Sequence, residues 1–260
     1  MARVRRCAFC PSEAKMSAEH LWSAWIGELL NFPSYEWRRV DPQSHEQQFG
    51  RSGGMNFTAK VVCKPCNNTW MSTIEGRTKD VFSSVIKDGT QTMLSLSDIV
   101  TLATFAFKCS VVASHMNSTH EPFFTRGDRE RFRTSLAIPG PVQMWTARYS
   151  GKHSGYGLLD SHVIGPNIPK ANPWFGLEFY VFTYIAGRLA FQVHAPRWEL
   201  VQQRGNPVPI MQPGQIWEST AVQFWPNGSG LPIQWPPPQD LSDDAINKFV
   251  HRWSGRIRLG

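Results

Sequence analysis

The sequence predicts an α+β fold in two parts, an N-terminal unit over residues 1–90 and a mixed region of helices and antiparallel strands over residues 91–260. Four of the five cysteines fall in two Cys-x-x-Cys pairs before residue 70, a pattern typical of a compact metal-binding unit. From about residue 142, β-branched and aromatic residues alternate between glycine and proline turns, as they do in antiparallel strands. An apolar fraction of 41% is enough to bury a core, so we expect a globular protein.

Three elements are predicted for the N-terminal unit. Between the cysteine pairs, the spacing of apolar residues predicts a helix over residues 21–30. A glycine turn then leads into a strand that ends at Cys63. After Cys66 the pattern predicts a second helix that ends near Gly89, because glycine is favoured at helix C-termini.

The C-terminal region is predicted to begin with a long helix over residues 94–116, for which Ser97 is a plausible N-cap. Two hairpins are predicted next, one turning at residues 150–154 and one at residues 186–187. The proline and glycine clusters at residues 204–215 and 225–239 predict loops. A last helix, capped by Ser242, closes the chain.

Composition and charge indicate where the protein is located and what kind of partner it can bind. No apolar run follows the basic residues at the start of the chain, and Lys108 interrupts the most apolar segment, residues 99–116. We therefore expect a soluble, cytoplasmic protein with no membrane contact. The net charge of +7 is compatible with a polyanionic partner, but it is shared between both parts of the chain, so any nucleic-acid surface must arise from folding.

The paired cysteines predict a structural zinc site rather than disulfides in that compartment. Two Cys-x-x-Cys pairs can supply all four tetrahedral ligands of Zn²⁺, and such a closed site has no open position for catalysis. Any chemistry must then come from neighbouring side chains. Cys109 stands alone in an apolar segment and is predicted to be a buried small hydrophobe. The predicted zinc ligands are Cys7, Cys10, Cys63 and Cys66.

Three residues next to the cysteine pairs can carry phosphodiester chemistry. Glu19 and His20 follow the first pair, and Asn67 follows the second pair directly. A carboxylate and a carboxamide oxygen are ligands that Mg²⁺ or Mn²⁺ accepts, so Glu19 and Asn67 are candidate ligands of a catalytic ion. A neutral imidazole beside that ion could deprotonate a water, which makes His20 the candidate general base.

These residues lie in the motifs CAFC, AEHLW and VCKPCNNTWMSTIE, which together resemble the HNH, or ββα-metal, nucleases. The resemblance covers roughly residues 5–80 and is to the four-cysteine zinc subset similar to endonuclease VII-like junction resolvases. It implies a DNA endonuclease that leaves 5′-phosphate and 3′-hydroxyl ends on double-stranded or branched DNA. It also implies that Glu19 and Asn67 hold the metal, that His20 is the base and that Asn56 is the structural asparagine of the motif.

Several interpretations stay open at this point. Arg51, Lys60, Lys64 and Arg77 lie close in sequence to these groups and are candidate phosphate contacts. A non-catalytic zinc module that binds nucleic acid or protein is the main alternative. Another is a nuclease gated by a partner through residues 91–260, a region that could also form a homodimer. Glu75, two helical turns after Asn67, could face the same side, but a solvated helix glutamate is the favoured interpretation.

Overall fold

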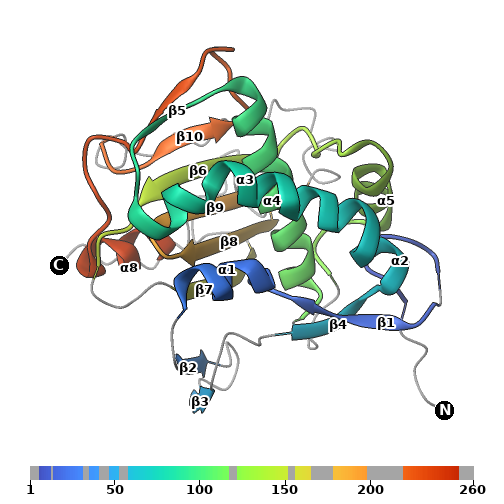
Figure 1. The fold of residues 1–260 in the computed structure, drawn as a ribbon. Coiled ribbons are helices and arrows are strands. Elements are labelled where there is room, and N and C mark those ends of the chain that lie inside the picture. The colour runs from blue at the N-terminus through green and yellow to red at the C-terminus, as the bar shows by residue number, and fades with distance from the viewer. Residues whose placement is uncertain are drawn as a thin grey trace.

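The computed structural model describes residues 6–12, 14–31, 35–40, 47–52, 58–116, 122–151, 156–164, 178–197 and 219–251. It is a mixed α+β structure with antiparallel sheets, which confirms the predicted fold class at that level (Figure 1). The described helices are α1 (Ala24–Leu30), α2 (Lys64–Cys66), the π-helical turn η1 (Asn67–Met71), α3 (Ser72–Asp88), α4 (Leu96–Ser114), α5 (Arg126–Ser135) and α8 (Asp243–His251). The described strands are β1 (Met16–His20), β2 (Tyr35–Val40), β3 (Gln47–Ser52), β4 (Thr58–Cys63), β5 (Thr92–Leu94), β6 (Gln143–Arg148), β7 (Tyr156–Ile164), β8 (Glu178–Ala186), β9 (Leu189–Pro196), β10 (Val222–Trp225) and β11 (Ile233–Trp235).

The N-terminal unit is built on the antiparallel pair β1 and β4, followed directly by α2, η1 and α3. The strand predicted to end at Cys63 is β4, and α3 ends at Asp88 with Gly89 as its left-handed cap, so both predictions are confirmed. The first helix begins at Ala24 rather than at Leu21, because His20 is still paired with Thr58 in β1 and the chain must first leave that sheet.

A five-stranded antiparallel sheet with the order β10-β6-β9-β8-β7 forms the centre of the C-terminal region. The hairpin predicted at residues 186–187 is confirmed as β8 and β9. The hairpin predicted at residues 150–154 is wrong, since β6 pairs with β9 and β10 and not with β7. Residues 143–147 of β6 are all buried, as expected of a strand with a neighbour on both sides. Part of the predicted loop over residues 225–239 is a strand, β11, which pairs with β5.

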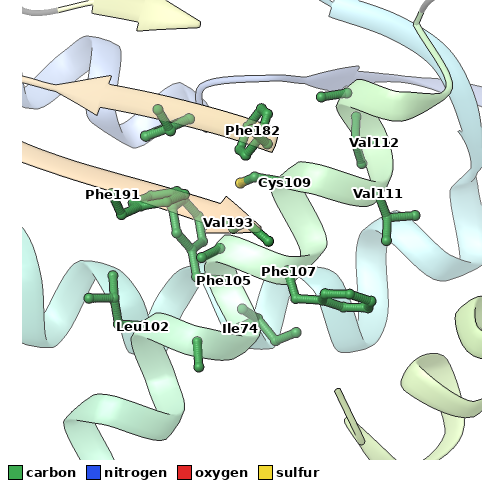
Figure 2. Packing of buried hydrophobic residues seen from close by; sticks show 14 of the residues in the cluster. Ile74, Leu102, Phe105, Phe107, Cys109, Val111, Val112, Phe182, Phe191 and Val193 are labelled. Carbon is green, nitrogen blue, oxygen red and sulfur yellow. The ribbon is translucent and has the colours of Figure 1, made fainter. Parts of the chain in front are cut away.

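Helix α4 packs against α3 on one side and against β9 and β10 on the other, so it lies inside the molecule (Figure 1). Its side chains meet Ile74 of α3 and the sheet residues Phe182, Phe191 and Val193, as Figure 2 shows. One hydrophobic core therefore includes residues from both predicted parts of the chain, and the boundary at residue 90 stays a prediction.

The N-cap of helix α4 lies two residues earlier than expected. Its N-cap is Ser95, not Ser97, because Ser95 Oγ accepts the backbone N–H of Asp98 at 3.2 Å while Asp98 Oδ2 accepts that of Ser95 at 2.9 Å. Among the described helices, α4 alone is long and apolar enough to cross a membrane, and 72% of that stretch is buried inside the molecule. Cys109 is buried in it, as predicted.

The β8–β9 turn is locked to the end of α3 through Gly187. Gly187 has a φ of 55°, and a Cβ added to it would collide with the carbonyl oxygen of Ile86. The backbone N–H of the next residue, Arg188, donates to this same oxygen at 2.7 Å. Gly187→Ala should therefore destabilise the protein by about 2–4 kcal/mol, from the left-handed backbone and the collision together. Urea unfolding measures the change.

Gly76→Ala is the matched control for this glycine. Gly76 lies within α3, and an added Cβ meets no atom within 4 Å. That change should stabilise the protein by roughly 0.5–1 kcal/mol, because alanine is the better helix former. Equal effects of the two substitutions would contradict the role given to the Gly187 turn.

Candidate metal centre and the neighbouring acidic cluster

The four paired cysteines are brought together by the β1–β4 pair. Their Sγ atoms all lie within 4.8 Å of one another, with Cys10 Sγ 3.6 Å from Cys63 Sγ. Two backbone hydrogen bonds fix the loops, from Ala8 N to Val61 O at 2.8 Å and from Lys64 N to Lys15 O at 3.1 Å. The predicted convergence of the four thiols is confirmed, and four sulfurs at this separation can hold a metal ion such as zinc.

Local hydrogen bonds favour the thiolate form of Cys7. Donation from the Cys66 thiol, together with the backbone N–H groups of Cys63 and Phe9, outweighs burial and lowers the pKa of Cys7 to about 4. The same contact and burial raise the pKa of Cys66. The N–H groups of Phe9 and Cys63 lie 3.5 Å and 3.3 Å from Cys7 Sγ. Backbone donors to sulfur stabilise the anionic form that a metal ion binds.

Aromatic rings brace the cysteine cluster from the C-terminal region. Phe9, between the first two cysteines, packs edge-on against Trp70 with ring centroids 5.0 Å apart. Phe132 of α5 contacts both of them, at 6.4 Å and 5.7 Å, and is fully buried. Helix α5 was not predicted from the sequence. It joins the two cysteine loops through rings that lie far apart in the chain.

A second link from α5 to the first cysteine pair is polar. Arg129 Nη1 donates to the carbonyl oxygen of Ala8 and also lies 2.7 Å from His115 Nε2. His115 Nδ1 lies 2.9 Å from the carbonyl oxygen of Val111, which can only accept, so Nδ1 carries the proton and Nε2 is the acceptor. Burial, with the Arg129 charge, lowers the pKa of His115 to about 4, so the ring is neutral at pH 7.

Glu19 is buried, and its partner is a lysine that lies 89 residues away in the sequence. The residue precedes the last position of β1, after a register shift in the β1–β4 pair, and its side chain is 3% exposed. Its Oε1 lies 3.1 Å from the Nζ of Lys108 in α4. Within the described part of the chain, the other oxygen, Oε2, has no hydrogen-bond partner. Glu19 therefore has one carboxylate oxygen paired with Lys108 and one without a hydrogen-bond partner among the described residues.

Lys108 also binds Glu75 of α3, at 2.6 Å, and is itself 1% exposed. Burial acts against its charge, but the Glu75 and Glu19 carboxylates outweigh burial and raise the pKa of Lys108 well above its usual value. Burial likewise opposes the charge on Glu75, yet the Lys108 ammonium lowers the pKa of that carboxyl. Lys108 and Glu75 are therefore both charged at neutral pH, and the interpretation of Glu75 as a solvated helix glutamate is wrong.

His20 ends β1 and is partly exposed. A positive charge on its ring would help to lower the pKa of Glu75, so the ring lies in the neighbourhood of that carboxylate. Within the described chain, no hydrogen bond joins His20 to Glu19 or to Asn67. The structure thus brings His20 to the edge of the acidic cluster, with no hydrogen-bond partner in the part of the chain that it describes.

Asn67 begins the π-helical turn η1, and its side-chain orientation follows from its neighbours. Ser17 Oγ donates its single hydrogen to the carbonyl oxygen of Val62 at 3.0 Å, so toward Asn67 it can only accept. The group that faces it at 3.0 Å is accordingly Asn67 Nδ2, which leaves Oδ1 available as a ligand atom. Single π-helical turns inside helices are frequent at functional sites. Asn68, the next residue, is exposed.

The predicted phosphate contacts are only partly covered by the structure. Lys60, Lys64 and Arg77 are all exposed, around the β4–α3 connection and on α3. Arg51 lies in β3, but its side chain is outside the described part of the structure. Asn56 lies outside the described residues altogether.

No protein-family model, curated protein or solved structure matches this chain. The site therefore has to be judged from its own chemistry. Lys108 is the residue that sequence reasoning missed as part of it. The signal was present, since a single lysine in an otherwise apolar helix must find a carboxylate when that helix is buried.

Proposed function

We propose that the chain is a metal-dependent endonuclease of the HNH type that hydrolyses DNA phosphodiester bonds. Four cysteines bind a structural Zn²⁺, Glu19 and Asn67 hold Mg²⁺ or Mn²⁺, and His20 acts as general base. The observation that supports this proposal is the order of the elements: His20 ends β1, β4 pairs with β1, and Asn67 begins η1 within the helical segment after β4. The cysteine cluster holds both segments at one end.

The side chains present suit the proposed chemistry. The atoms without a hydrogen-bond partner among the described residues, Glu19 Oε2 and Asn67 Oδ1, are both hard oxygen donors of the kind Mg²⁺ accepts. The partly exposed imidazole of His20 can take a proton from an attacking water. When bound, a divalent ion supplies stabilisation of the negative charge that develops on the phosphate. Exposed Lys60, Lys64 and Arg77 can contact neighbouring phosphates.

Nicking of supercoiled plasmid by the zinc-loaded protein tests the proposal. We expect the plasmid to be relaxed when Mg²⁺ or Mn²⁺ is present and to stay supercoiled when excess chelator removes that ion. His20→Ala should slow nicking about 10²- to 10⁴-fold through loss of the base, and Asn67→Ala should weaken it through loss of a ligand. Asn68→Ala is the matched control, because Asn68 is the exposed neighbour of Asn67 and should keep wild-type activity.

The second candidate function is a non-catalytic zinc module that binds nucleic acid or a partner protein. The ion pair between Glu19 and Lys108 favours it, because this pair already engages the carboxylate assigned to the metal. Plasmid that is retarded on a gel but never cut would support this function. Cutting that begins only after a protein is added would support a nuclease gated through the C-terminal region. Equal nicking by the wild type, His20→Ala and Asn67→Ala would refute the assigned site.

A further inference from the structure

Lys108 is a charged side chain in the middle of the hydrophobic core. It lies on α4 between Phe105 and Cys109, which are both fully buried, and its own side chain is 1% exposed. An ammonium group in such surroundings is stable only when carboxylates compensate it. Here two of them do, and they come from different elements, Glu19 from β1 and Glu75 from α3.

The two carboxylates converge on a single atom. Glu19 Oε1 and Glu75 Oε1 lie 3.1 Å and 2.6 Å from the same Nζ. Carboxylates from separate elements that point at one position are the arrangement with which proteins hold divalent cations. Two carboxylates this close would repel each other without a cation between them, so this position requires a positive charge of some kind.

We propose that Lys108 is a built-in cation that stands between Glu19 and Glu75 in the place of a second divalent ion. The site then takes at most one divalent ion, through the remaining oxygen of Glu19. That part of the inference rests on the proposed function. Lys108 would be a positioning residue, since it acts through Glu19 and does not touch the substrate.

While Lys108 fills this position, an ammonium without waters is favoured there over a hydrated metal ion. Mg²⁺ gives up its waters reluctantly and usually keeps several of them. The position is enclosed, because Lys108 and Glu19 are 1% and 3% exposed. The lysine stem brings its charge through the core, where the face of the Phe105 ring lies 5.4 Å from Nζ and stabilises the cation further.

The inference also connects the two predicted parts of the chain. Glu19 and Glu75 belong to residues 1–90, whereas Lys108 belongs to α4 in residues 91–260. The charge of the candidate site is thereby set by a helix whose position depends on the C-terminal sheet. The control variant follows from the geometry: removing Glu75 together with Lys108 removes both the cation and one of the carboxylates.

The test counts Mn²⁺ ions bound per zinc-loaded full-length chain, by electron paramagnetic resonance of free Mn²⁺. We expect the wild type to bind one ion at most. Lys108→Met should bind one ion more than the wild type. Its melting temperature should rise by about 5 °C or more at a Mn²⁺ concentration roughly 100 times the dissociation constant. The double variant Lys108→Met/Glu75→Gln should lose the extra ion.

Three results would overturn the inference: two ions bound to the wild type, a folded Lys108→Met that binds no additional ion, or an extra ion that persists in the double variant. Failure of Lys108→Met to fold at any Mn²⁺ concentration would overturn it as well, because the ion would then be unable to substitute for the ammonium. The readout also separates this inference from the proposed function. Wild-type nicking with two bound ions refutes only the role of Lys108, whereas an extra ion in Lys108→Met without any nicking refutes only the nuclease.

Discussion

Cys63→Ser is expected to abolish zinc binding and to unfold the N-terminal part of the chain. Cys63 is fully buried, ends β4 and is one of four sulfurs within 4.8 Å of one another. Structural zinc contributes roughly 10–16 kcal/mol to the folding of small zinc domains, which equals or exceeds the total stability of about 5–15 kcal/mol of a typical protein. Zinc content by atomic emission and near-ultraviolet circular dichroism measure the two effects.

Cys109→Ala is the matched control for this prediction. Cys109 is as buried as Cys63, but it lies in α4 outside the sulfur cluster, and burial raises its pKa to about 12, so it stays a thiol. This variant should keep its zinc and lose only the packing of one sulfur. His20→Ala should also keep zinc and fold. A Cys63→Ser protein with stoichiometric zinc and a wild-type melting temperature would contradict the structural role of the cluster.

Phe132→Ala is expected to destabilise the protein by about 3–5 kcal/mol, the usual range for removing a buried aromatic ring. Phe132 is fully buried, and its ring lies 4.7 Å from Phe107 of α4, in addition to its contacts with Phe9 and Trp70. Its removal leaves a cavity where α4, α5 and both cysteine loops meet. Chemical denaturation of the zinc-loaded protein measures the loss.

Two variants test whether the loss comes from this junction. Phe132→Leu keeps most of the volume and should cost no more than about 1.5 kcal/mol. Leu231→Ala removes a side chain that is 64% exposed and should change the stability by less than about 0.5 kcal/mol. The proposed bracing of the cysteine loops by α5 would be wrong if Phe132→Ala unfolded at the same denaturant concentration as the Leu231→Ala protein.

The elements that were predicted correctly depend on local chemistry. Gly89 ends α3 because its left-handed conformation suits glycine, and Ser242 caps α8 by accepting the backbone N–H of Ala245 at 3.2 Å. The β8–β9 hairpin was found because a glycine turn separates two apolar runs. The predicted convergence of the cysteines follows from the same kind of rule, since two residues between ligands is a spacing typical of tetrahedral zinc sites.

The errors concern contacts between distant segments. Strand β6 pairs with β9 and β10 rather than with β7, and β11 pairs with β5 from about 140 residues away in the chain. The sequence shows that a strand is apolar but not which strand will lie beside it. Helix α5 was missed because, of its ten residues, only Phe132 is buried, so it has almost no apolar periodicity.

The sequence by itself determined the four cysteines that come together and can hold a metal ion, the antiparallel α+β class and the proposal that Glu19, His20 and Asn67 act together. Only the tertiary structure revealed that Glu19 is held by Lys108 and that Glu75 shares this cation. The physical reason is how far apart in the chain the interacting residues lie. Ligand spacing and helix caps are fixed by bond geometry within a few residues, whereas the partner of a buried charge is chosen by how distant elements pack around it.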